Sequence, residues 1–184
     1  MVFAKKEILL KDGRACILRP AQASDAQAML DYLRAVSAET PFLLRGEEEI
    51  TDTLESEERL LEQKREDPRE MMMVAEADGW IAGNCAVLSY GSPRRAAHRC
   101  GFAIAVRKAY WGLGLGSAML GYACSLAQTL GYEQMELEVV EGNERAKRLY
   151  ERFGFEETGK NYRALKYADG AYRDEYRMVK VLNG

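Results

Sequence analysis

The sequence predicts a mixed α/β fold with one mostly antiparallel central sheet of about seven strands and flanking helices. Short apolar runs separated by turn dipeptides fill much of the first half and are typical of antiparallel hairpins. Helical and strand patterns alternate in the second half. The length of 184 residues, with 47% hydrophobic and 30% charged residues, is typical of one soluble domain. We therefore expect residues 1–184 to form a single domain.

The first half supplies most of the antiparallel strands. Two apolar runs, 7–10 and 15–19, flank Asp12-Gly13 and predict a hairpin. Apolar residues at helical spacing predict helices over about 24–38 and 47–66. Strand patterns then follow at 71–77, 80–90 and 97–106 with turn residues at each corner, which predicts a β-meander.

The second half alternates helices and strands. A glycine-rich loop leads into a predicted helix over about 115–130, and Gly131 is placed to end it. A strand is expected over 134–140. Asn143 can cap a helix over about 144–152, and Gly154 can end that helix. Further strands are expected to begin at 153 and to cover 172–181.

Charge is distributed unevenly along the chain. The net charge is −3, which argues against a basic nucleic-acid-binding domain. Ten acidic and three basic residues lie between positions 47 and 67, so this window carries −7 and the rest carries +4. The window is either a solvated helix face or, as an alternative, a surface that attracts a cationic amine.

The cysteines point to core packing. Cys16, Cys85, Cys100 and Cys124 lie far apart, form no CxxC pair, and share the chain with one histidine. We therefore expect no metal site and interpret the four residues as buried free thiols in a reducing cytosol. The first ten residues are too short and too charged for a signal peptide, and no apolar run is long enough for a membrane span. These observations predict a cytoplasmic protein without a membrane partner.

A glycine-rich loop precedes the helix that is predicted to start near residue 115. Gly112, Gly114 and Gly116 alternate in it, and helix N-termini offer unpaired N–H groups to anions. The amides that could hold a pyrophosphate are those of Gly112, Leu113, Gly114, Leu115, Gly116 and Ser117. The spacing differs from a dinucleotide-binding fingerprint, and a Walker loop would require a lysine before Ser117. A loop without a ligand remains an alternative.

A second motif stands about thirty residues further on. Asn143, Ala146 and Tyr150 share the predicted helix, and Gly154-Phe155 follows it. Together with the Val106–Gly116 pattern, this motif resembles the GNAT superfamily of acyl-CoA-dependent N-acyltransferases. The resemblance is strongest over residues 70–157 and implies a GNAT fold over the single domain, with acetyl-CoA as the cofactor and no metal.

The resemblance also implies which residues hold the cofactor. The backbone of Ile104, Ala105 and Val106 would pair with the pantetheine arm, and the amides of 112–117 would take the pyrophosphate. Asn143 would contact the CoA arm as well as cap its helix. Trp111 stands where the family commonly has Arg or Gln, so the loop lacks one side-chain donor for the phosphates.

The implied activity is transfer of an acetyl group from acetyl-CoA to a primary amine by direct attack in a ternary complex, with a small-molecule amine favoured. Alternatives are a protein N-terminal or lysine acetyltransferase and a non-catalytic acyl-CoA-binding sensor. Tyr150 would protonate the departing thiolate, although it could instead be a core aromatic. The base could be His98, Glu136, Glu138 or a chain of waters. A homodimer is compatible with the sequence, and no nucleic-acid partner is expected.

Overall fold

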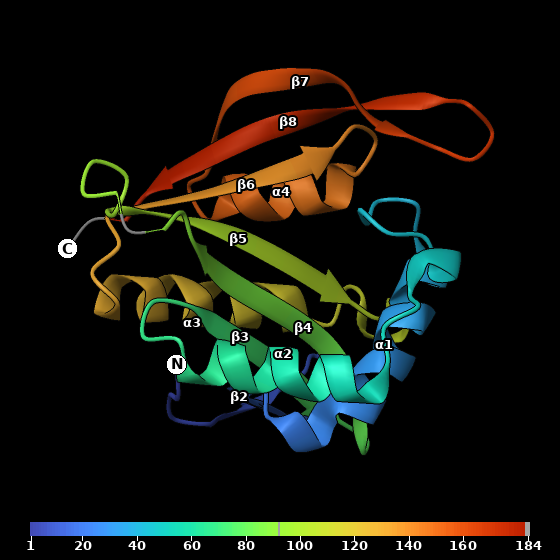
Figure 1. Ribbon diagram of the computed structural model, residues 1–184, viewed down its shortest axis with the longest axis vertical. Helices are drawn as coiled ribbons and strands as arrows, with labels where there is room; N and C mark the ends of the chain where they lie inside the picture. Colours follow the sequence, from blue (N-terminus) through green and yellow to red (C-terminus); the bar gives the residue numbers. More distant parts are fainter. Residues whose placement is uncertain (92, 183–184) are drawn as a thin grey trace.

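The computed structural model describes residues 1–91 and 93–182. Within these residues it contains an eight-stranded sheet in the order β1-β2-β3-β4-β5-β6-β8-β7 (Figure 1). The strands are β1 (Lys6–Leu9), β2 (Ala15–Pro20), β3 (Met71–Ala77), β4 (Trp80–Ser89), β5 (Arg99–Val106), β6 (Gln134–Val140), β7 (Glu156–Lys166) and β8 (Tyr172–Val181). Neighbouring strands are antiparallel, and the exception is the parallel pair β5–β6. The predicted mostly antiparallel α/β fold is confirmed, and each of the eight strand patterns in the sequence corresponds to one of these strands.

Helices cover both faces of the sheet. On one face lie α1 (Ala26–Glu39) and α2 (Leu54–Glu66), which enclose a small core with β3 and β4. The opposite face carries α3 (Leu115–Thr129) and α4 (Glu144–Arg152), over the larger core (Figure 1). Since α2 packs against α1 and β3, its many carboxylates lie two strands away from β5.

The elements of the second half match the sequence patterns closely. Met135, Leu137 and Val139 of β6 alternate into the core, as period-two strands require. In α3 the buried positions follow the 3.6-residue period from Leu115 through Met119 to Leu126. Gly131, with φ +81°, follows the end of this helix as predicted.

The acidic window folds differently from the single helix expected over 47–66. Glu47–Glu49 form a 3-10 turn, and the Glu49 carboxylate accepts a hydrogen bond of 2.7 Å from the Gly46 N–H. The α-helix begins only at Leu54, after Thr53 accepts from the Ser56 N–H at 3.2 Å. Each of these local hydrogen bonds starts its own element, so the segment forms a 3-10 turn followed by a separate α-helix.

The four cysteines are free and buried, as predicted. Burial raises the pKa of the Cys16 thiol to about 11 and that of Cys100 to about 12, so both are protonated at neutral pH. In the described ranges, no helix is long and apolar enough to cross a membrane.

Candidate active site

The parallel strands β5 and β6 separate after a short ladder (Figure 1). In the part of the chain that the structure describes, they pair only from Arg99 to Gly101 on β5. The remainder of β5, residues 102–106, pairs with β4 on one side and has no ladder partner on the other. We call this segment, which includes Ile104, Ala105 and Val106, the open edge of β5. Its backbone groups can pair with an extended ligand, because unpaired strand edges accept added strands.

A buried tyrosine fixes the open edge from the α1 side. The hydroxyl of Tyr32 donates to the Ala105 carbonyl at 2.7 Å and accepts from the Asn84 N–H at 3.0 Å, so it bridges β4 and β5. Burial raises the pKa of Tyr32 far above its ordinary value and keeps this donor protonated. Sequence reasoning missed this residue, whose only signal is a tyrosine inside an otherwise apolar helix face.

The glycine-rich loop follows β5 after a short 3-10 turn, Lys108–Tyr110. Gly112 and Gly114 have φ of +78° and +89°, conformations that glycine adopts without steric cost. A side chain at Gly112 would meet no atom within 4 Å, so the space in front of the loop is open. Among the described residues, none accepts a hydrogen bond from the N–H groups of 112–117. The loop therefore presents free amides at the N-terminus of α3, as an anion site requires.

Trp111 turns its side chain back toward the open edge. Its Nε1 donates to the Val106 carbonyl at 2.6 Å, and the Arg145 guanidinium stacks 3.1 Å from its ring centroid. Partial desolvation against the ring lowers the pKa of Arg145, and the guanidinium remains a cation at neutral pH. The stack places a guanidinium beside a loop that itself lacks one.

The helix α4 positions Asn143, at its N-cap, and Tyr150, the predicted general acid. The Asn143 side chain accepts from the Ala146 N–H at 3.3 Å, which confirms its predicted role as a cap. Tyr150 is 6% exposed and packs 5.8 Å from the Phe155 ring. Burial, with a smaller contribution from the Cys85 thiol, raises the pKa of Tyr150 above its ordinary value. Because Cys85 pairs with Ile104 of the open edge, Tyr150 lies against the same part of the sheet.

Glu136, one of the three side chains considered as bases, is held in an ion pair. It is 4% exposed and accepts from Arg99 Nη2 at 2.7 Å, from Arg99 Nε, and from Gln134 Nε2 at 2.7 Å. The Arg99 guanidinium lowers the pKa of Glu136 below its usual range. A carboxylate stabilised in this way is a weak proton acceptor.

His98 and Glu138 are placed differently. His98 precedes β5 and lies on the far side of the three-residue ladder from the open edge. At about 3.3 Å per residue, it is roughly 20 Å along the chain from Ile104. Glu138 is exposed on β6, 3.9 Å from Arg177 of β8.

Glu175 on β8 is a carboxylate that sequence reasoning missed. It lies two residues from Arg177, which pairs with Glu138, so Glu175 and Glu138 share a face of the sheet. Burial, and secondarily the charge of Glu138, raise the pKa of Glu175. Its side chain forms no ion pair within the described residues. In the sequence, Glu175 alternates with Tyr176 and Met178, the core residues of the final strand, and no local signal distinguishes it from other surface carboxylates.

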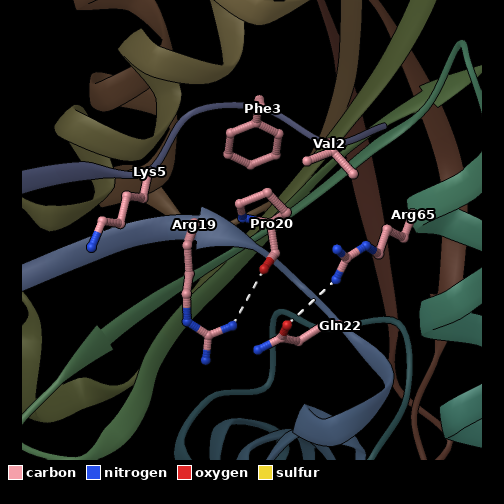
Figure 2. Close-up of a pocket in the computed structure, with 7 residues that line it drawn as sticks. All are labelled: Val2, Phe3, Lys5, Arg19, Pro20, Gln22 and Arg65. Atoms are coloured by element: carbon pink, nitrogen blue, oxygen red, sulfur yellow. Dashed lines mark hydrogen bonds between the residues drawn. The ribbon is translucent and has the colours of Figure 1, made fainter.

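A hollow of about 270 Å³ lies elsewhere, between the N-terminal segment, the end of β2 and α2 (Figure 2). Its most polar side chain, Arg19, donates to both Asp25 oxygens at 2.7 and 2.8 Å and to Glu76 at 2.9 Å. Arg65 donates to Gln22 at 3.4 Å across the same hollow. These cations are engaged in holding the first helical turn and β3.

Sequence comparison identifies the class of protein. The chain matches the acetyltransferase (GNAT) family over residues 32–155, and it belongs to that family. A search of curated proteins finds no match. In the described chain, no cluster of three or more His, Cys, Asp or Glu residues could hold a metal ion.

Solved structures agree with this family. A GNAT-family acetyltransferase from Streptococcus pneumoniae is 30% identical, with a TM-score of 0.85, and the match covers 90% of this chain and 99% of that one. The Salmonella typhimurium protein yncA, solved with its cofactor acetyl-CoA, is 19% identical over 91% and 94%, with a TM-score of 0.78. A ribosomal-protein-alanine N-acetyltransferase from Brucella melitensis is 22% identical over 89% and 98%, with a TM-score of 0.78.

Proposed function

We propose that this protein is an acetyl-CoA-dependent N-acetyltransferase that acts on a primary amine, with a small-molecule amine as the favoured acceptor. The observation that carries the proposal is the continuity of the open edge of β5 with the free amides of 112–117. An extended arm with a phosphate at one end fits this arrangement. Family membership and the likeness to a protein solved with acetyl-CoA support it.

The residues fit acetyl-CoA in three parts. The backbone of Ile104, Ala105 and Val106 would pair with the pantetheine arm, since this edge has no ladder partner among the described strands. The pairing would use the backbone groups that Tyr32 and Trp111 do not already engage. The amides from Gly112 to Ser117 would bind the pyrophosphate, with the positive end of the α3 dipole behind them. The Asn143 amide group, whose oxygen caps α4, would contact the arm. When bound, acetyl-CoA supplies an activated acetyl thioester.

Tyr150 would be the general acid. A buried tyrosine with a raised pKa stays protonated and can donate to the sulfur as the C–S bond breaks. A thiol has an ordinary pKa near 8.5 and tyrosine near 10, and burial raises the pKa of Tyr150 further, so full proton transfer to the thiolate is uphill. The hydrogen bond in the transition state would supply much of the benefit. The N–H near Val106 would polarise the thioester carbonyl.

The amine must lose a proton before or during attack, because an alkylamine with a pKa near 10.4 is mostly protonated at pH 7. Glu175 is the better-placed acceptor, since it is half-buried, has a raised pKa and lacks an ion-pair partner in the described chain. Glu138 on the same face, or water linked to either carboxylate, would then pass the proton to bulk solvent.

The experiment is release of free CoA from acetyl-CoA in the presence of a panel of acceptors. The panel contains polyamines, amino acids, peptides with a free α-amine and peptides with an internal lysine. Turnover on a small amine supports the proposal, and turnover restricted to peptides would assign a protein acetyltransferase instead. Binding of acetyl-CoA without acetylation of any acceptor would indicate a non-catalytic sensor and contradict the enzymatic proposal.

A further inference from the structure

Three arginines form a cationic strip along α4. Arg145, Arg148 and Arg152 are spaced by three and four residues, so they share one face of the helix. All three are exposed and line a surface hollow of about 440 Å³ together with Glu151. None of them pairs with a carboxylate in the described part of the chain, and the hollow therefore carries a net positive charge.

Lys147, a fourth cation of α4, has a different environment. Its ammonium contacts the Glu157 carboxylate at 2.9 Å and lies 4.4 Å from the Tyr176 ring centroid. On the side of α4 that faces β7 and β8, the charge of Lys147 is thus compensated by the carboxylate of Glu157. Unlike Lys147, the three arginines form no ion pair with any described residue, and they outnumber Glu151 in the hollow, which favours an anionic ligand from outside the chain.

The strip begins beside the glycine-rich loop. A side chain built at Gly116 would come within 3.4 Å of Leu149, and one at Gly121 within 3.3 Å of Phe153, so α4 packs along α3. Arg145 stacks on Trp111, the residue immediately before Gly112. From there the strip extends along α4 for about 10 Å, at 1.5 Å per residue. An anion held by the loop and a second anionic group a few bonds away could therefore bind to one continuous surface.

We propose that the arginine strip binds the 3′-phosphate of CoA and makes the protein selective for CoA over dephospho-CoA. This inference rests on the proposed function. The ribose of CoA carries this phosphomonoester a few bonds from the pyrophosphate, which the loop amides would hold. Guanidinium groups match phosphate oxygens in paired hydrogen bonds, and a dianion relieves the repulsion among neighbouring arginines.

The test compares the affinities for CoA and dephospho-CoA by calorimetry in the full-length protein. The wild type should bind CoA at least about tenfold more tightly than dephospho-CoA, because a hydrogen-bonded phosphate contact contributes more than 1.4 kcal/mol. The double variant Arg148→Gln, Arg152→Gln should bind CoA about tenfold more weakly while its affinity for dephospho-CoA stays unchanged. The matched control is Arg59→Gln, an exposed arginine of α2, which should leave both affinities unchanged.

Two results would overturn the inference. Equal affinity of the wild type for the two ligands would show that the 3′-phosphate makes no productive contact. An equal loss of both affinities in the double variant would mean that the arginines contact the pyrophosphate, or attract either ligand only through their overall positive charge. Both results are compatible with acetyl-CoA binding by the wild type, so the proposed function would stand. If the wild type binds neither CoA nor dephospho-CoA, the proposed function itself is refuted.

Discussion

Replacing Gly112 with alanine separates the cost of backbone strain from the cost to ligand binding. Gly112 has φ +78°, and an added side chain would meet no protein atom within 4 Å. The folded protein therefore loses only about 1–2 kcal/mol from the left-handed backbone, with no clash. For a chain of this size, each kcal/mol lowers the melting temperature by about 2–4 °C. The new methyl group would occupy the open space in front of the loop amides.

The matched control is Gly13→Ala in the β1–β2 turn. Gly13 has φ +86° and the same free space around an added side chain, so it should show the same loss of stability. Calorimetry with CoA should show that Gly112→Ala binds on the order of tenfold to a hundredfold more weakly, since a charge-assisted hydrogen bond contributes about 1.5–3 kcal/mol. Gly13→Ala should bind CoA normally. Equal CoA affinity in the two variants would refute the assignment of the phosphate to this loop.

Two further variants test how the protein supports the reaction. Tyr32→Phe leaves the Ala105 carbonyl and the Asn84 N–H without their shared partner. The free energy of unfolding should therefore fall by about 1–3 kcal/mol, and KM for acetyl-CoA should rise. An unchanged melting temperature and an unchanged KM would contradict the positioning role of Tyr32. The pKa of Glu175 is raised, so its charged form is disfavoured in the folded state, and kcat/KM should increase with pH through a pKa above the usual carboxyl range. Glu175→Gln should abolish that acidic limb without lowering the melting temperature at pH 7, because ionisation of Glu175 costs stability above its unfolded pKa; an unchanged pH profile would remove Glu175 as the base.

The sequence predicted the elements that depend on local signals. The bounds of β6, α3 and α4 follow from apolar periodicity and from Asn143 and Gly131, which act within a few residues of their own positions. The two glycine-bearing motifs likewise identified the family, which the match over 32–155 confirms. The division of the acidic window into a 3-10 turn, in which Glu49 accepts from the Gly46 N–H, and a separate α-helix was not predicted.

Contacts between distant residues could not be predicted in the same way. Tyr32 reaches the Ala105 carbonyl 73 positions away, and Arg99 neutralises Glu136 across 37 positions. The first contact depends on where α1 packs, and the second on the register at which β5 meets β6. Glu175 acquires its raised pKa only when β8 pairs with β6. These long-range arrangements decide which candidate base is ionised and paired and which is free.

The most direct test of the central claim is the turnover of Tyr150→Phe. The ring is 6% exposed and packs on Phe155, and its hydroxyl makes no hydrogen bond to any described residue. Phenylalanine should therefore fill the same space, and the melting temperature and the Kd for CoA should remain unchanged. If Tyr150 protonates the thiolate, kcat should fall by about a hundredfold or more. A kcat equal to that of the wild type, with intact CoA binding, would contradict the account.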